Sequence, residues 1–200
     1  MKVVIADYGA GNLRSVTSAF VRAGCEPEIS IDPDAVRTAP LAVIAGVGHV
    51  ESAARGLAGN GLDEAIRDRA REGKPVLGIC VGMQLLCGES DEGGRGLELV
   101  PARVSRLRAS RVPHMGWNAL RVARRSVLLE GLDGEDVYFA HSYAVDAAPP
   151  DSVAAEVEHG GPVVAALEHG ALAGVQFHPE RSGAAGARLL GNAVQWSRSA

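Results

Sequence analysis

The sequence has few of the features that mark several large classes of protein. Cysteine occurs only three times in 200 residues, with no CxxC and no zinc-ligand spacing. An odd cysteine count of this kind argues against a disulfide framework, so we expect a reducing, cytoplasmic setting. No apolar run approaches the ~18 residues of a transmembrane helix, and the first apolar run is too short for a signal peptide. We therefore expect no membrane partner.

The chain has no excess of positive charge, and aromatic residues are scarce. The formal net charge is −4 and aromatic residues make up 4% of the chain. Binding of nucleic acid typically needs a basic surface with interleaved aromatics, so we expect no nucleic-acid partner. The six histidines form neither an HExxH motif nor a close ligand pair. We therefore expect no metal site and no cofactor.

The apolar pattern indicates an α/β protein. In the first half, short apolar runs alternate with helical patterns, which is typical of a doubly wound parallel sheet. This half predicts strands at residues 3–6, 28–31, 41–45 and 76–79, and helices at 13–23, 62–71 and from residue 82 onward.

After residue 94 the apolar runs become short and lose their intervening helices, which indicates antiparallel strands added to the sheet or folded over it. The predicted strands are residues 97–100, 102–107, 117–122, 137–145, 153–157, 163–167 and 172–177, followed by a terminal helix at 184–196. With no repeat and no linker, the sequence predicts one domain over residues 1–200: a single doubly wound, mostly parallel sheet with antiparallel strands added in the second half.

The residues that follow the strand at 76–79 indicate a reactive cysteine. The sequence Gly-Ile-Cys-Val-Gly-Met-Gln occupies residues 78–84 and leads into a predicted helix. Two glycines around a central residue allow a sharp strand-to-helix turn that exposes the central side chain, as in a nucleophile elbow. The helix N-terminus favours the thiolate form of Cys80. A buried structural cysteine is the alternative for this residue taken alone.

A base for this nucleophile follows the strand at 172–177. The sequence Gln-Phe-His-Pro-Glu occupies residues 176–180, so His178 and Glu180 stand two residues apart at a strand end. His178 can accept the thiol proton while Glu180 fixes the imidazole tautomer. A similar strand-end position is held by Ala-Gly-Val-Gly at 45–48, where the N–H of Val47, with that of Val81, can form an oxyanion hole. A plain glycine turn is equally compatible with residues 45–48.

These motifs together resemble a known family, the class I (triad) glutamine amidotransferases. The resemblance extends over residues 4–183. It narrows to the glutaminase subunits of imidazole glycerol phosphate synthase through three further motifs: Asp-Tyr-Gly-Ala-Gly-Asn-Leu-Arg-Ser at 7–15, Pro-His-Met-Gly-Trp-Asn at 113–118 and His-Ser-Tyr at 141–143. Two positions depart from the family's pattern, with Ala45 where proline is usual and Arg181 where lysine is frequent.

The resemblance implies a role for each matching residue. Cys80 would form a glutamyl thioester, His178 and Glu180 would complete the triad, and Val47 and Val81 would hold the oxyanion. Glutamine would be bound by Gly48, Gln84, Glu92, Ser142 and Tyr143. The resemblance also implies a partner, the (β/α)8-barrel synthase subunit, which receives the ammonia and makes imidazole glycerol phosphate and aminoimidazole carboxamide ribotide for histidine biosynthesis. The residues expected to face this partner are Asn12, His114, Met115, Trp117 and Arg181.

Other functions remain open at this point. The same chemistry could serve pyridoxal phosphate, anthranilate or purine synthesis, although Pro-His-Met-Gly-Trp-Asn argues against these pathways. A pseudo-glutaminase that only regulates a partner is a non-enzymatic alternative. A cysteine peptidase of similar fold is a further alternative, but binding of a glutamine substrate explains the presence of Gln84 better than peptidase activity does.

Overall fold

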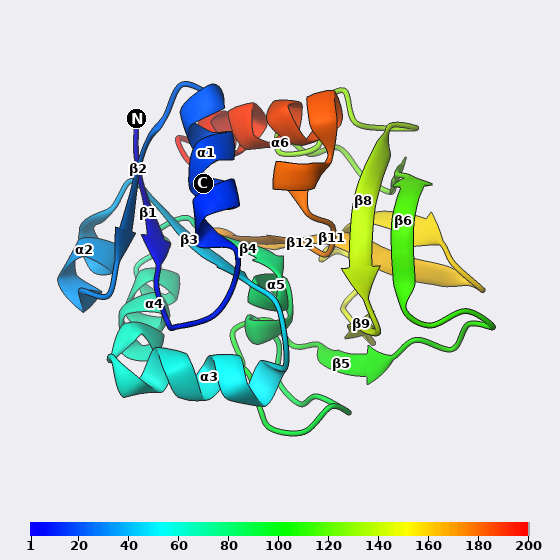
Figure 1. Cartoon of the computed structure of the whole chain (residues 1–200), viewed down its shortest axis with the longest axis horizontal. Coiled ribbons are helices and arrows are strands. Elements are labelled where there is room, and N and C mark those ends of the chain that lie inside the picture. The colour runs from blue at the N-terminus through cyan, green and yellow to red at the C-terminus, as the bar shows by residue number, and fades with distance from the viewer. Residues whose placement is uncertain (200) are drawn as a thin grey trace.

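The computed structural model describes residues 1–199. In this part of the chain a central eight-stranded sheet has the order β2-β1-β3-β4-β12-β11-β10-β7 (Figure 1). The strands from β2 to β12 pair in parallel, and β11, β10 and β7 continue the sheet in antiparallel pairing. The bounds are β1 Lys2–Ala6, β2 Glu26–Ser30, β3 Leu41–Gly46, β4 Val76–Cys80, β7 Arg121–Val122, β10 Val153–Glu158, β11 Pro162–His169 and β12 Leu172–Val175.

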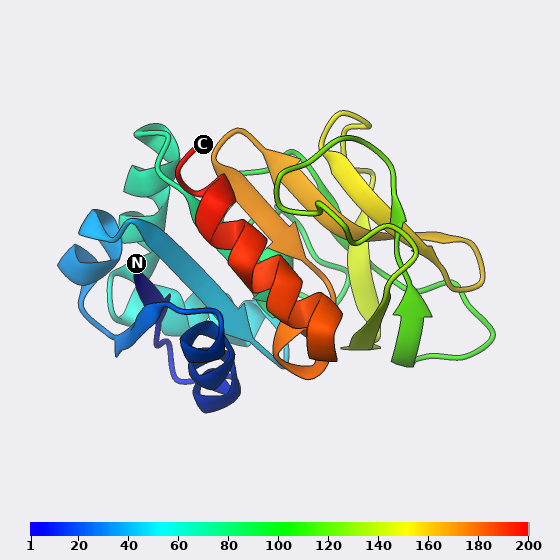
Figure 2. The same cartoon turned by 90° about the horizontal axis from the view of Figure 1, so that it is seen from above.

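Helices cover both faces of the sheet (Figures 1 and 2). One face carries α1 and α6, and the other carries α3, α4 and α5, with α2 beside α4 at the edge. The central strands β3 and β4 are buried along their whole length, as strands with helices on both faces must be. The bounds are α1 Leu13–Arg22, α2 Pro33–Thr38, α3 Val50–Gly59, α4 Leu62–Arg71, α5 Val81–Leu85 and α6 Gly183–Trp196. Among the described residues, no helix is both long and apolar enough to cross a membrane.

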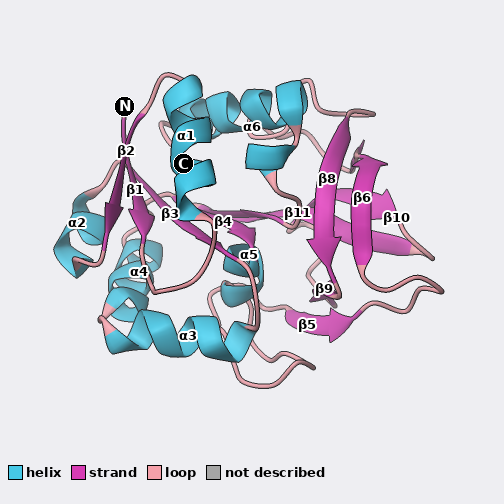
Figure 3. Cartoon of the chain, viewed as in Figure 1, coloured by secondary structure: helices cyan, strands magenta, loops and turns pink. Residues whose placement is uncertain are grey.

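Two antiparallel ribbons lie over the far end of the sheet, where Figure 3 shows strands gathered beyond the helical layers. One pairs β5 (Arg103–Arg106) with β9 (Tyr143–Asp146), and the other pairs β6 (His114–Ala119) with β8 (Asp136–His141). Strands are therefore both added to the sheet and folded over it. The predicted class, a mostly parallel α/β sheet with antiparallel strands from the second half, is confirmed.

Several predicted elements differ from the structure. Residues 137–145 form two strands in different ribbons, because the chain crosses from β8 to β9 at Ser142. Residues 117–122 likewise divide between β6 and β7. Residues 97–100 are not a strand: the N–H groups of Leu97, Leu99 and Val100 donate to the carbonyls of Leu85 and Leu86 at the end of α5.

The sequence prediction also missed two helices, α2 and α3. Glycines at positions 56 and 59 make α3 a poor helix by intrinsic propensity. Packing explains Gly56, since a Cβ there would lie 2.4 Å from the carbonyl oxygen of Tyr8. Glycine is thus required where α3 touches the loop after β1.

A buried arginine joins the helical layer to the sheet. Arg69 of α4 is fully buried and donates hydrogen bonds to the carbonyls of Val36, Arg37, Ala39 and Pro75 at 2.6–3.2 Å. Burial lowers the pKa of the guanidinium to about 10. These bonds connect the end of α2 to the start of β4, the strand that leads to Cys80.

Candidate active site

Cys80 lies at a sharp turn between β4 and α5. Its φ of 55° is in the left-handed region, which is unusual for a residue with a side chain and costs on the order of 1–3 kcal/mol. The turn needs both flanking glycines. A Cβ on Gly82 would lie 1.8 Å from the carbonyl oxygen of Ile44, and one on Gly78 would lie 2.5 Å from the carbonyl oxygen of Gly82. The structure therefore contains the strained strand–turn–helix unit expected of a nucleophile elbow.

His178 and Glu180 reach Cys80 from the neighbouring strand. β12 pairs in parallel with β4, placing Val175 beside Ile79, so both chains leave the sheet at the same edge. His178 Nδ1 lies 2.9 Å from Glu180 Oε1, and both side chains are almost fully buried. Brought together in this way, a thiol, an imidazole and a carboxylate can act as nucleophile, base and orienting group.

The surroundings of His178 stabilise its protonated form. Burial lowers the pKa of its imidazole, but hydrogen bonds and charge interactions with Cys80 and Glu180 outweigh burial and raise it to about 10. A proton accepted from Cys80 is therefore held on His178 and is available for a leaving group. Glu180 Oε2 is buried without a hydrogen-bond partner, so the carboxylate interacts mainly through Oε1.

A pocket of about 350 Å³ opens beside the Cys80 sulfur. It is lined by Cys80 together with all seven residues that the sequence assigned to the oxyanion hole and to glutamine binding: Val47, Gly48, Val81, Gln84, Glu92, Ser142 and Tyr143. These residues come from four separate segments of the chain. The volume suits an amino-acid ligand.

Glu92 is held in this pocket by two contacts near the start of α3. Its Oε1 lies 2.9 Å from His49 Nδ1, and its Oε2 accepts a hydrogen bond of 3.0 Å from the N–H of Val50. The carboxylate is about 10% exposed. Glu92 thus presents a fixed negative charge to a ligand with an ammonium group.

The loop at residues 46–48, which the sequence predicts to contribute to an oxyanion hole, begins where β3 ends. Tyr8 donates a hydrogen bond of 3.0 Å to the carbonyl of Ala45, and a Cβ on Gly46 would lie 1.7 Å from the Tyr8 hydroxyl. Burial, with a smaller contribution from Cys80, raises the pKa of Tyr8, so the hydroxyl stays a donor. Val47 is half exposed and Gly48 has a φ of +103°. The loop is therefore anchored at its start and open beyond Gly46.

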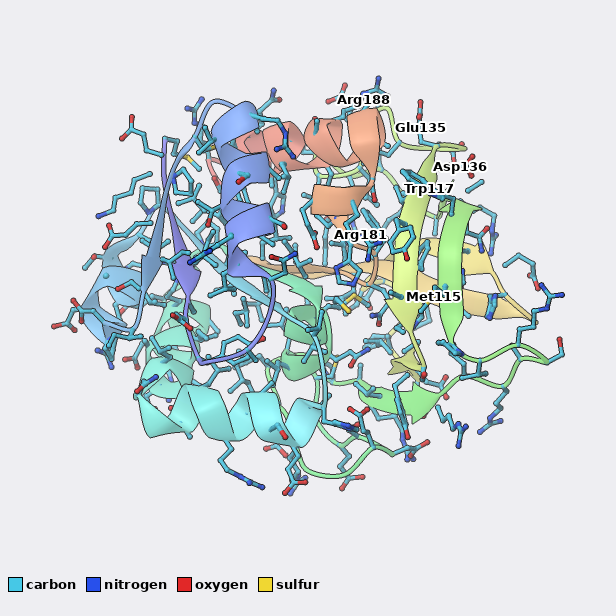
Figure 4. The ribbon with its side chains drawn as sticks, in the orientation of Figure 1. Met115, Trp117, Glu135, Asp136, Arg181 and Arg188 are labelled. Atoms are coloured by element: carbon cyan, nitrogen blue, oxygen red, sulfur yellow. The ribbon has the colours of Figure 1, made fainter. Side chains whose placement is uncertain are left out.

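The residues assigned to the partner surface differ in exposure. Met115 and Trp117 are large exposed apolar side chains on β6, at 65% and 57%. Arg181 lies 4.0 Å above the ring of Tyr138, and in Figure 4 it is on the same side of the molecule as Met115 and Trp117. Asn12 is exposed to solvent, and it also lines a small cavity that His178 and Glu180 line as well.

His114 is placed differently from Met115 and Trp117. It lies on the opposite face of β6, 3% exposed, with its ring 4.4 Å from that of Phe139. The side chain of His114 is therefore part of the interior in this structure. Alternation along the strand could have indicated this, since a residue next to an exposed one points to the other face.

Sequence reasoning missed other residues of the site. His49, Pro113, Ala140 and His141 line the pocket, and the buried Gln176 contacts Cys80. His141 and Gln176 belong to motifs that the sequence did show, so proximity to Ser142 and His178 was the available signal. Within residues 1–199, no three His, Cys, Asp or Glu side chains are grouped so as to hold a metal ion.

Fold, elbow and pocket define a class of enzyme. The family model described as "Glutamine amidotransferase class-I" matches residues 4–195. The chain belongs to the class I glutamine amidotransferase family. A crystal structure of a glutamine amidotransferase has the same fold, with a TM-score of 0.79 at 20% identity, covering 98% of this chain and 98% of that one.

Curated relatives narrow the assignment within the class. The chain is 43% identical to imidazole glycerol phosphate synthase subunit HisH of Mycolicibacterium paratuberculosis, over 96% of this chain and 97% of the relative. It is 44% identical to the protein of the same name from Symbiobacterium thermophilum, over 98% and 93%. Similarity on this scale extends over nearly the whole length of each protein.

Proposed function

We propose that this chain is the glutaminase component of an imidazole glycerol phosphate synthase and acts in histidine biosynthesis. The observation that carries the proposal is that Cys80 and the seven predicted oxyanion and ligand residues line one pocket, while the buried pair His178 and Glu180 lies next to Cys80. The names of the relatives support the choice of pathway. Cysteines 25, 80 and 87 are all free, which fits the proposed cytoplasmic setting.

The proposed reaction begins when His178 accepts the thiol proton and the Cys80 sulfur attacks the side-chain amide carbon of glutamine. The amide oxygen gains negative charge, and the N–H groups of Val47 and Val81 stabilise it. His178 then gives its proton to the departing nitrogen, releasing ammonia and leaving a glutamyl thioester. Water activated by His178 hydrolyses the thioester and frees glutamate and the Cys80 sulfur, while Glu180 keeps the imidazole oriented throughout.

Charge complementarity supports glutamine as the substrate. Glu92 offers a carboxylate to the α-ammonium group, and Gln84 offers its amide oxygen, because both hydrogens of its nitrogen are already donated to Tyr143 and Gln176. Gly48, Ser142 and Tyr143 provide main-chain groups and a hydroxyl for the α-carboxylate. These contacts recognise the backbone part of an amino acid and leave its side-chain amide next to Cys80.

The ammonia is then delivered to a (β/α)8-barrel synthase subunit, which forms a heterodimer with this chain. The docking surface that we propose consists of Met115, Trp117 and Arg181, with Asn12 at its edge and His114 behind it. Exposed aromatic, methionine and arginine side chains are characteristic of interface centres. Arg181 is pre-positioned by the ring of Tyr138.

The proposal is tested with Cys80→Ser in the complex. We expect the variant to release no glutamate from glutamine, while the complex still makes imidazole glycerol phosphate from added ammonium. Production of glutamate at the normal rate would contradict the nucleophile assignment. Failure of the chain to bind the histidine-pathway barrel would contradict the proposed pathway.

A further inference from the structure

Gln176 is a buried side chain for which the triad mechanism has no use. It follows β12, is fully buried, and lies two residues before His178. Its Nε2 donates a hydrogen bond to Cys80 Sγ at 3.7 Å, and its Oε1 accepts one from Gln84 Nε2 at 2.9 Å. The amide therefore contacts the reacting sulfur on one side and the pocket wall on the other.

Neighbouring groups determine which end of the Gln176 amide faces the sulfur. Gln84 Nε2 lies 2.9 Å from the carbonyl oxygen of Tyr143, and a carbonyl oxygen can only accept. The Gln84 nitrogen must therefore face Tyr143, and its second hydrogen points to Gln176. Gln176 must then accept with its oxygen, which leaves its N–H group directed at Cys80.

Two histidines extend the same chain of donors and acceptors. His141 Nδ1 lies 2.8 Å from the carbonyl oxygen of Tyr143, so Nδ1 carries the hydrogen and Nε2 accepts. His114 Nδ1 lies 3.1 Å from His141 Nε2 and donates a hydrogen bond to it. His114 Nε2 accepts a hydrogen bond of 3.3 Å from the side-chain amide of Asn118. Burial lowers the pKa of His114 to about 4 and that of His141 to about 3, which keeps both rings neutral.

We propose that Gln176 is a catalytic residue that donates an N–H hydrogen bond to the thiolate of Cys80, with its orientation fixed by Gln84 and the carbonyl oxygen of Tyr143. This inference rests on the proposed role of Cys80 as nucleophile. His178 and Tyr8 are the titratable groups that also interact with the Cys80 sulfur. Gln176 adds a neutral donor that does not titrate.

The hydrogen bond acts at the two steps in which the sulfur carries charge. When the thiol proton passes to His178, the electron pair stays on sulfur and the N–H of Gln176 stabilises it without transferring a proton. During attack the pair forms the C–S bond and charge moves to the amide oxygen. When water hydrolyses the thioester, the C–S bond breaks, its electrons return to sulfur, and the same N–H stabilises the leaving thiolate.

The test measures the reactivity of Cys80 directly, in the complex with the synthase subunit. Iodoacetamide alkylates thiolates, so the rate of Cys80 modification against pH gives a midpoint. We expect Gln176→Leu to move this midpoint upward by about one pH unit and to lower kcat for glutamine about 10- to 100-fold, as for loss of a hydrogen bond to a charged group. Gln176→Met, which keeps the length without a donor, should do the same if leucine disturbs folding.

Two further variants isolate the role of the donor. Gln195→Leu changes an exposed glutamine of α6 and should leave the alkylation midpoint and kcat unchanged. Gln84→Leu removes a pocket acceptor and the donor that orients Gln176, but leaves the N–H of Gln176 in place, so it should raise KM and should move the alkylation midpoint less than Gln176→Leu does. The double variant Gln84→Leu/Gln176→Leu should lower kcat/KM by less than the product of the two single effects, because the two side chains are hydrogen-bonded to each other.

An unshifted midpoint with unchanged kcat in both Gln176 variants would overturn the inference. A raised KM alone would also overturn it, because Gln176 would then act only through Gln84. A wild-type complex that releases no glutamate would instead refute the proposed function. The alkylation midpoints would still report on the contact between Gln176 and the sulfur, so the two failures are distinguishable.

Discussion

Replacement of Glu180 by glutamine should destabilise the folded chain in a strongly pH-dependent way. Glu180 is one of two partners that raise the pKa of His178 from 6.5 to about 10 against the effect of burial. At roughly 1.4 kcal/mol per pH unit, this difference corresponds to about 5 kcal/mol of stabilisation of the folded state. Cys80 supplies part of it, so the share lost in Glu180→Gln is about 2 kcal/mol.

The sign follows from the direction of the pKa change. Because the folded pKa of His178 is above the unfolded value, the stabilisation is complete below pH 6.5 and is lost as pH rises through about 10. Urea unfolding of wild type and Glu180→Gln at several pH values measures the difference in unfolding free energy. We expect about 2 kcal/mol near pH 6, declining to near zero above pH 10.

The matched control is Glu135→Gln. Glu135 forms an exposed ion pair with Arg188 at 3.4 Å, and exposed pairs contribute little to stability. This variant should unfold like the wild type at every pH. A constant difference between wild type and Glu180→Gln from pH 6 to 10, or one that grows with pH, would refute the reasoning about His178.

Three other predictions concern the supports of the site. Arg69→Met should lower the unfolding free energy by about 3 kcal/mol in urea titrations, because several buried carbonyls lose their hydrogen-bond donor. Removal of the desolvation cost of the guanidinium offsets only part of this loss. An unchanged urea midpoint would contradict the prediction. Gly82→Ala should abolish glutaminase activity and lower Tm, since its Cβ would lie 1.8 Å from a main-chain oxygen of β3; an active, stable variant would show that the elbow can relax. Tyr8→Phe should accelerate amide hydrogen exchange at residues 46–48, because the carbonyl of Ala45 loses its donor; unaltered exchange would mean that the hydroxyl does not anchor the loop.

Much of the candidate site could be proposed from the sequence because its residues stand at strand ends in short motifs. Cys80, His178 and Val47 each follow a buried apolar run, and parallel strands bring such positions to one edge of the sheet. Glu92 required the family resemblance, since nothing in its local pattern points to the pocket. Its placement depends on contacts with residues 49 and 50, some forty positions earlier.

What the sequence could not predict depends on side-chain pairs that are far apart in the chain. Gln84 and Gln176 are separated by 92 positions, and only the folded chain shows that their amides meet. The burial of His114 depends in the same way on its pairing with β8. The prediction missed helix α3 for another reason. Gly56 lowers the local helix propensity, and glycine is needed at this position because α3 contacts the loop after β1 too closely for a Cβ.

The place of β12 in the sheet has a consequence for how the chain is made. Residues 172–175 form the strand that covers one side of β4, so β4 is an uncovered edge while those residues are still in the ribosome. An apolar strand with a free edge is a template for aggregation, and the proposed nucleophile at the end of this strand lacks its proposed base until His178 emerges. We therefore expect chains that end before residue 172 to lack glutaminase activity and to associate, because the residues that cover β4 and supply the proposed base are made last.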